Sequence, residues 1–213
     1  MALNLLDEKW MRRCIQLAKN GRQSASPNPM VGAVIVHDGR IIGEGFHVRC
    51  GQAHAEVNAI NSVRPEDCAL LAESTIYVSL EPCAHYGRTP PCAELIVRTR
   101  IPRCVVGCQD PFAMVAGRGI AILREAGGDV TVGVLEAECL ALNSHFMTAQ
   151  MQQRPFITLK WAVSADGFIG RWSDDDALLP QPVALSTPRS LLRVHHLRSL
   201  HDAILVGHTT LLS

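Results

Sequence analysis

The dipeptide Asp38-Gly39, which separates two apolar runs, constrains the fold of this chain more than any other feature. The runs cover residues 31–36 and 40–45. An Asp-Gly pair in this setting is a strong short-range signal for a β-hairpin. After residue 54 the pattern changes, because short apolar runs of strand length alternate with segments of helical spacing. The chain is therefore expected to begin its sheet with an antiparallel pair and to extend it through helical crossovers.

This alternation predicts an α/β fold with a mixed sheet and helices on both of its faces. Beyond the hairpin we expect strands at 75–80, 104–108 and 130–134, and helices at 7–20, 54–63, 92–99, 118–125 and 135–150. The alternation of strands and helices ends near residue 150. We therefore predict a first domain that covers residues 1–150.

The remaining segment, residues 151–213, is too short to form a domain of the same kind. Residues 151–154 have the composition of a linker, and strands are expected at 155–163 and 203–206 with a helix at 187–200 between them. Two strands and one helix cannot bury a core by themselves. We interpret this segment as the first part of a second domain, and the chain as a fragment of a longer protein.

The composition favours a globular protein that acts on small molecules. Hydrophobic residues make up 47% of the chain, and 20 basic residues balance 20 acidic ones. A neutral chain lacks the positive field with which proteins collect nucleic-acid phosphates, so no nucleic-acid partner is expected. The N-terminus has no signal-peptide pattern, and no apolar run approaches the roughly 20 residues that span a bilayer. We expect a soluble, cytoplasmic protein without membrane contact, whose cysteines are not paired in disulfides.

Three polar clusters stand at the ends of predicted elements: His54-Ala55-Glu56, Pro82-Cys83 and Pro91-Cys92. A catalytic zinc site uses three nitrogen or sulfur ligands from the protein and leaves the fourth position to water. One imidazole and two thiolates meet that requirement. Both cysteines lie near predicted helix starts, where the helix dipole favours the thiolate. We interpret His54, Cys83 and Cys92 as the ligands of a zinc ion.

Glu56 follows His54 by two residues, at the start of the same predicted helix. It can reach a water on the metal without being a ligand itself. Zinc lowers the pKa of such a water to about 7, and the carboxylate can pass the proton to a departing nitrogen. The zinc deaminases have this arrangement as H-x-E followed by P-C-x-x-C. We therefore expect Glu56 to be the catalytic acid and base of a deaminase.

The spacing of the two cysteines departs from that pattern, because eight residues separate Cys83 from Cys92. The insert contains His85, Tyr86 and Arg88, which suit an anionic substrate such as a sugar phosphate. A deaminase of another base, such as guanine, cytidine or tRNA adenosine, is an alternative. A structural zinc module is a second alternative, and it would need a fourth ligand, for which Cys50 is the distant candidate.

The chain resembles the bifunctional riboflavin-biosynthesis deaminase–reductase family over essentially its whole length. The residues that carry the resemblance are Asn28 to Gly32, Gly43 to His47, Gly51 to Glu56, Glu81 to Cys92 and Asp110-Pro111, followed by Pro155 to Gly167 in the second part. The long insert between the cysteines is the most specific of these. The resemblance implies a cytidine-deaminase-like first domain, followed by the start of a dihydrofolate-reductase-like α/β domain.

The resemblance also implies a reaction. In this family zinc-dependent hydrolysis removes the 2-amino group of 2,5-diamino-6-(5-phosphoribosylamino)pyrimidin-4(3H)-one and yields 5-amino-6-(5-phosphoribosylamino)uracil. The substrate contacts implied by matching positions are Asn28, His47, His85, Arg88 and Asp110. In the deaminase part this chain departs from the family in two ways, with Arg88 in place of the usual Lys and Phe112-Ala113 in place of Asn-Pro.

For the second part, the family reduces the ribose of the deaminated product with NADPH. Val163 and Thr210 match NADPH-contacting positions and Arg198 matches a substrate position, whereas Ala184 stands where the family often has Trp. The later Asp-x-Pro segment and glycine-rich cofactor loop of the family do not occur. We expect deaminase activity without reductase activity, a phosphorylated pyrimidine as the small-molecule partner, and a homo-oligomer as one way to cover an exposed apolar face.

Overall fold

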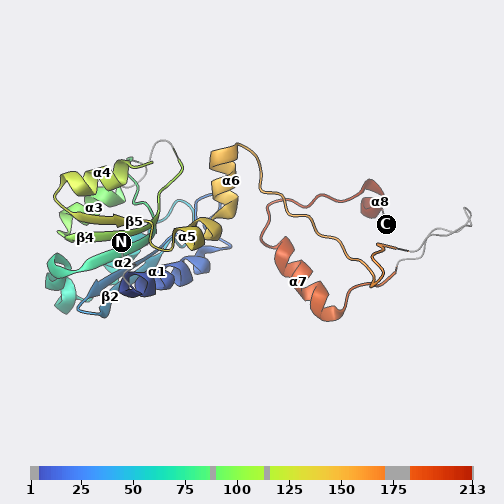
Figure 1. Ribbon diagram of the computed structural model, residues 1–213, viewed down its shortest axis with the longest axis horizontal. Helices are drawn as coiled ribbons and strands as arrows, with labels where there is room; N and C mark the ends of the chain where they lie inside the picture. Colours follow the sequence, from blue (N-terminus) through green and yellow to red (C-terminus); the bar gives the residue numbers. More distant parts are fainter. Residues whose placement is uncertain (1–4, 87–89, 113–115, 171–182, 213) are drawn as a thin grey trace, which may run out of the picture. The chain divides into compact units, whose positions relative to one another are not determined.

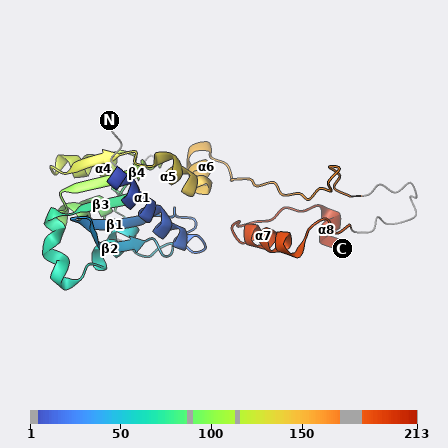
Figure 2. The same cartoon turned by 60° about the horizontal axis from the view of Figure 1, so that its bottom comes forward.

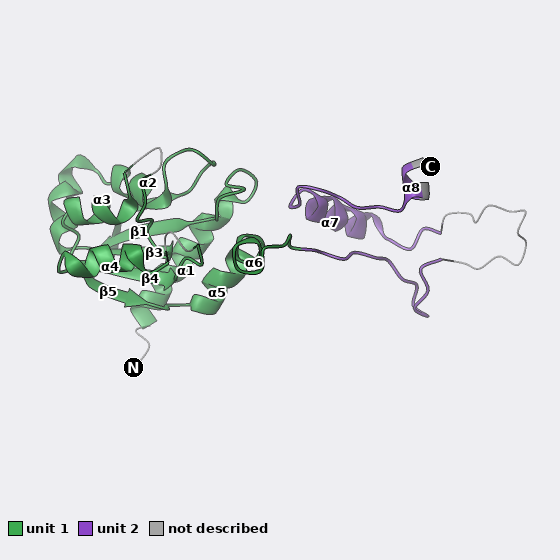
Figure 3. Cartoon of the chain, turned by 90° about the horizontal axis from the view of Figure 1, so that it is seen from above, with its two compact units in different colours: residues 1–156 green, residues 157–213 purple. Residues whose placement is uncertain are grey.

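The computed structural model describes residues 5–86, 90–112, 116–170 and 183–212. The chain divides into two compact units, Met1–Phe156 and Ile157–Ser213 (Figure 3). Among the described residues, no helix is both long enough and apolar enough to cross a bilayer.

A five-stranded mixed sheet forms the centre of the first unit, in the order β2-β1-β3-β4-β5. Its strands are β1 (Gly32–His37), β2 (Arg40–Phe46), β3 (Thr75–Leu80), β4 (Arg103–Cys108) and β5 (Asp129–Val132). Strand β1 pairs antiparallel with β2 and with β3, whereas β3, β4 and β5 are parallel. The mixed sheet predicted from the sequence is confirmed.

The predicted hairpin joins β1 to β2. Asp38 has φ of 45° and Gly39 has φ of 73°, and positive φ at both central residues is what a type I′ hairpin turn requires. The pairing of the two strands shifts register between Ile35 and Val36. The hairpin thus follows from local turn chemistry.

Helices cover both faces of this sheet (Figures 1 and 2). One face packs against α1 (Leu5–Ala18) and α5 (Glu136–Leu142), and the other against α2 (Ala55–Asn61), α3 (Cys92–Arg98) and α4 (Arg118–Glu125). Each face of the sheet has its own hydrophobic core. Strand β3 contributes to both, because Ile76 and Val78 lie in the core against α2, α3 and α4, and Tyr77 lies in the core against α1 and α5. This alternation explains why the inner strands are apolar at nearly every position.

The predicted helix at 135–150 is wrong in one respect, because it is two helices. Helix α5 ends at Leu142 and α6 (Ser144–Gln152) begins after Asn143, whose φ of −111° and ψ of 31° are not helical. The Asn143 side chain bonds both backbone groups of Met30, from Met30 N to Oδ1 and from Nδ2 to Met30 O, each at 2.8 Å. This long-range pairing accompanies the break. Two 3₁₀ helices, η1 (Lys19–Gly21) and η2 (Pro65–Glu73), were not predicted.

In the second unit the predicted helix is confirmed as α7 (Pro188–Arg198), which the Thr187 side chain caps by accepting from Ser190 N. A further short helix, α8 (His208–Leu212), follows. The strands predicted at 155–163 and 203–206 are wrong, because neither segment joins a sheet. A strand needs a hydrogen-bonding partner, and no described residue provides one. The dihydrofolate-reductase-like character of this unit stays a prediction.

Candidate metal centre and active-site cavity

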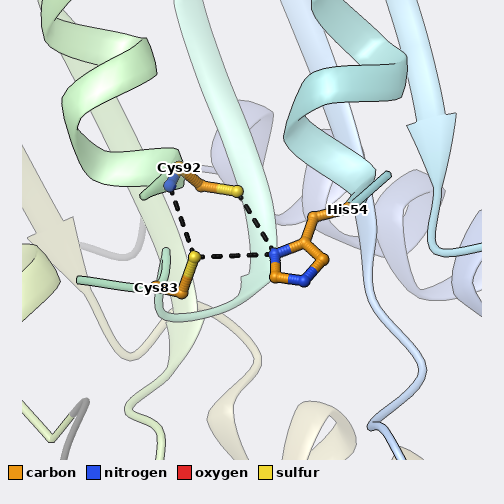
Figure 4. Close-up of side chains that lie close together, drawn as sticks. All are labelled: His54, Cys83 and Cys92. Atoms are coloured by element: carbon orange, nitrogen blue, oxygen red, sulfur yellow. Dashed lines mark hydrogen bonds between the residues drawn. The ribbon is translucent and has the colours of Figure 1, made fainter. Parts of the chain in front are cut away.

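Three side chains from separate elements converge on one point in the first unit (Figure 4). His54 is the N-cap residue of α2, Cys83 follows the end of β3, and Cys92 is the first residue of α3. The His54 Nδ1 atom lies 3.5 Å from Cys83 Sγ and 3.4 Å from Cys92 Sγ. Backbone N–H of Cys92 points to Cys83 Sγ at 3.3 Å, so the start of α3 also orients the first thiol.

These distances fit a zinc ion. A tetrahedral zinc with bonds of about 2.3 Å to sulfur and 2.0 Å to nitrogen holds its N and S donors roughly 3.5 Å apart. The three donor atoms lie within 4.8 Å of one another, and within the described ranges no other His, Cys, Asp or Glu belongs to this group. Cys50, the fourth ligand that a structural site would need, is exposed and outside the group. The donor set is that of an open, catalytic zinc site.

The two thiols influence each other strongly. A hydrogen bond from the Cys92 side chain lowers the pKa of Cys83, which His54 lowers further against the effect of burial. The same bond to Cys83 raises the pKa of Cys92, and burial adds to the rise. Without a metal ion, these opposite shifts favour a thiolate at Cys83 and a thiol at Cys92. A divalent cation bound here would displace the remaining thiol proton, since metal ligation requires both thiolates.

Glu56 lies in the first turn of α2 and is buried, with 3% of its surface exposed. Burial, and after it the nearby Cys83 thiolate, raise its pKa to about 7, although His54 opposes the rise. A carboxyl group with a pKa near neutrality can both accept and donate a proton at pH 7. Glu56 is not part of the metal-ligand group, in agreement with a role in proton transfer.

A cavity of about 350 Å³ opens beside the metal-ligand group, within the range of small-molecule sites. His54, Glu56 and Cys83 contribute to its wall. Four of the five residues predicted to contact substrate in this domain also line it: Asn28, His47, His85 and Asp110. The fifth, Arg88, lies outside the described residues. Further lining residues are Pro27, Pro29, Val31, Leu80, Glu81, Phe112, Phe146 and Gln150.

The buried His47 and the half-buried Asn28 form a pair on one side of this cavity. His47 Nε2 lies 3.1 Å from Asn28 Nδ2, and His47 Nδ1 lies 3.1 Å from the carbonyl oxygen of Ala53. The carbonyl can only accept, so the Nδ1–H donates to Ala53 and Nε2 accepts from the Asn28 amide. Burial lowers the pKa of His47, which favours this neutral tautomer. Asn28 is thereby held in a fixed orientation.

His85 and Asp110 lie on the cavity wall beside Phe112. The Nδ1 atom of His85 is buried and, in the part of the chain that the structure describes, has no hydrogen-bond partner. An unpaired buried nitrogen is costly, so it is suited to meet a polar group of a ligand. Asp110 accepts a hydrogen bond of 2.8 Å from Phe112 N, and burial raises the pKa of its carboxyl group.

Among the further lining residues are Glu81, Phe146 and Gln150, to which sequence reasoning gave no role in the site. The last two lie four residues apart on α6, so helical spacing places them on one face. Which face meets the cavity depends on the break at Asn143, which no local signal indicated.

The residues predicted for the reductase site lie in the second unit. Val163 lies in a segment without regular structure, Arg198 ends α7, and Thr210 lies in α8. Their role as cofactor and substrate contacts stays a prediction.

Comparison with known protein families agrees with the site geometry. Residues 5–108 match the model of the cytidine and deoxycytidylate deaminase zinc-binding region. The matched range runs from α1 to the end of β4. It includes His54, Glu56, Cys83 and Cys92.

Individual relatives match over nearly the whole chain. The riboflavin biosynthesis protein RibD of Actinobacillus pleuropneumoniae is 41% identical over 209 residues, which are 98% of this chain and 53% of the relative. A Thermotoga maritima structure, a diaminohydroxyphosphoribosylaminopyrimidine deaminase/5-amino-6-(5-phosphoribosylamino)uracil reductase, superposes with a TM-score of 0.85 at 41% identity, covering 98% of this chain and 57% of that one. Acinetobacter baumannii RibD superposes with a TM-score of 0.80 at 41% identity, covering 92% and 52%. The chain thus spans about half the length of the relatives it matches.

Proposed function

Because this chain belongs to the family of the RibD riboflavin-biosynthesis proteins, we propose that its first domain, residues 1–150, is a zinc-dependent deaminase. The proposed substrate is 2,5-diamino-6-(5-phosphoribosylamino)pyrimidin-4(3H)-one, and the products are 5-amino-6-(5-phosphoribosylamino)uracil and ammonia. The observation that carries the proposal is the convergence of one imidazole and two thiols beside a buried carboxyl group on a cavity wall. The Thermotoga relative bears the name of this activity.

In this mechanism His54, Cys83 and Cys92 hold the zinc ion. When bound, zinc lowers the pKa of a coordinated water to about 7 and so supplies a nucleophile at neutral pH. Glu56 takes the proton that the attacking water loses at C2 and later delivers a proton to the departing 2-amino nitrogen. One water is consumed and one ammonia is released. The burial of Glu56 keeps the transferred proton away from bulk solvent.

Substrate binding uses the polar and apolar walls of the same cavity. Phe112 and Phe146 offer apolar surface for a flat ring. Asn28, His85 and Asp110 offer hydrogen bonds to its substituents. Arg88 is the proposed cation for the substrate phosphate, by its position in the insert between the cysteines.

The variant Glu56→Gln tests the mechanism. It keeps the size of the side chain and the metal ligands but cannot carry the proton. We expect unchanged zinc content and a loss of ammonia release of about 10²- to 10⁴-fold. The matched control is Glu73→Gln, since Glu73 is exposed at the end of η2; this variant should retain wild-type activity. Turnover of the Glu56 variant near the wild-type rate would refute the proton-transfer role.

The substrate is tested with a panel of the diaminopyrimidine ribotide, guanine, cytidine and a tRNA with adenosine at the wobble position. Ammonia release from the ribotide alone is expected. Release from one of the other compounds at a higher kcat/KM would favour the alternative deaminases.

The NADPH-dependent reduction of the ribose is proposed for full-length relatives only. In the described part of the second unit no residue is buried, so we expect no reductase activity from this chain.

A further inference from the structure

Glu81, which directly follows β3, is a buried carboxylate that the proposed mechanism does not use. Its exposed fraction is 4%. It accepts four backbone hydrogen bonds: Oε1 accepts from Gly119 N at 3.0 Å and Ile120 N at 3.3 Å, and Oε2 accepts from Gly117 N at 3.0 Å and Asp110 N at 3.3 Å. The donors come from the start of α4 and from the loop that precedes it.

The charge of Glu81 suits this position. The first N–H groups of a helix have no partners within the helix, and the helix dipole makes this end positive. Gly117, the N-cap residue of α4, has a left-handed φ of 77° and no side chain with which to cap. The Glu81 carboxylate therefore accepts the N–H groups that an N-cap side chain usually accepts. It also accepts the backbone N–H groups of Gly117 and Gly119. These donors would otherwise be free to bind an external anion.

The start of α4 also makes a close backbone contact with the segment that follows β3. A Cβ atom on Gly119 would lie 1.9 Å from the carbonyl oxygen of Pro82, so only glycine lets α4 approach this segment. Pro82 in turn precedes Cys83. The backbone N–H of Glu81 continues the β3–β4 pairing by donating to Cys108 O at 3.0 Å. The carboxylate is thus fixed at its own end by the sheet.

The loop held by Glu81 carries part of the cavity wall. Asp110 N is one of the four donors, and the Asp110 carboxylate holds Phe112 N. Both Asp110 and Phe112 line the cavity. Loss of the Glu81 contacts would free this loop while leaving the metal ligands, which come from α2, α3 and the Cys83 segment, in place.

We propose that Glu81 is a positioning residue for substrate binding, which acts through the backbone of the loop that bears Asp110 and Phe112. The inference rests on the proposed function of the cavity. A carboxylate is required because each of its two oxygens accepts two hydrogen bonds. A glutamine of the same shape has only one oxygen, so either orientation of its amide leaves two of the four N–H groups unpaired.

The test compares Glu81→Gln with Glu125→Gln, an exposed carboxylate near the other end of α4. For Glu81→Gln we expect unchanged zinc content and a rise in KM for the diaminopyrimidine ribotide of roughly tenfold or more, with a smaller change in kcat. The Glu125 variant should match the wild type in all three. A loss of zinc from Glu81→Gln would overturn the proposal, because Glu81 would then act on Cys83.

A double-mutant cycle separates positioning from general stability. If Glu81 acts through Asp110, then Glu81→Gln should raise KM much less in an Asp110→Asn background than in the wild type. Fully additive effects would contradict the proposal.

Hydrogen exchange of the unmodified protein gives a readout that needs neither activity nor a variant. The amides of Gly117 and Gly119 should exchange much more slowly than solvent-exposed loop amides. Exchange at the rate of an open loop would overturn the anchoring by Glu81, even if the Glu81 variant failed to fold. Absence of ribotide deamination by the unmodified protein would instead overturn the proposed function, and the catalytic consequence of Glu81 with it.

Discussion

Replacing Asn143 by alanine should destabilise the first unit and impair substrate binding together. Asn143 is 4% exposed, and its two hydrogen bonds of 2.8 Å to Met30 connect the start of α6 with the loop that carries Asn28. Each bond contributes about 1 kcal/mol net, and a stranded buried partner costs about 1–3 kcal/mol more. Alanine recovers about 0.7 kcal/mol of helix propensity. The expected loss in the free energy of unfolding is therefore about 2–4 kcal/mol.

The propensity gain has a structural consequence. The apolar spacing of residues 135–150 is that of one continuous helix, and without the Asn143 side chain the break between α5 and α6 loses its cause. A continuous helix would move Phe146 and Gln150 away from the cavity. We therefore expect a higher KM for the ribotide in addition to the lower stability.

Urea unfolding followed by far-UV circular dichroism measures the stability change, and ammonia release measures KM. The control is Asn61→Ala at the exposed end of α2, which should change stability by less than about 0.5 kcal/mol. An Asn143→Ala protein as stable as this control, with wild-type KM, would refute the reasoning.

Two further predictions concern the metal and pH. Chelation of zinc should abolish ammonia release and lower the Tm of the first unit, since Cys83 and Cys92 are then left to share one proton; an unchanged Tm, or full activity after complete zinc removal, would contradict the metal site. The Arg40 guanidinium donates bonds of 2.9 and 2.7 Å to Asp67 and holds the pKa of that carboxyl below its ordinary value of 3.8. The stability that this pair contributes is fully present above pH 3.8 and is lost as the pH falls through the lower pKa of the folded state. Asp67→Asn should therefore reduce the free energy of unfolding at pH 7 but not in strong acid. Urea unfolding at both pH values measures this difference.

Much of the first unit could be predicted from the sequence because its signals are local. Asp38-Gly39 specifies a turn by its own backbone preferences. The helix at 118–125 and the strand at 75–80 end where glycine, proline or polar residues interrupt the period. The types and order of His54, Cys83 and Cys92 also restrict the chemistry to soft, tetrahedral metal ligation before any distance is known.

Tertiary structure alone decided the features that depend on distant partners. Asn143 ends α5 by bonding a residue 113 positions earlier, and the carboxylate of Glu81 meets donors 29 to 39 residues later. The segments at 155–163 and 203–206 have strand-like composition, yet form no strands. The physical reason is common to all three: turns and helices satisfy their backbone within a few residues, whereas a strand, a buried amide or a buried carboxylate is satisfied only by what the fold brings beside it.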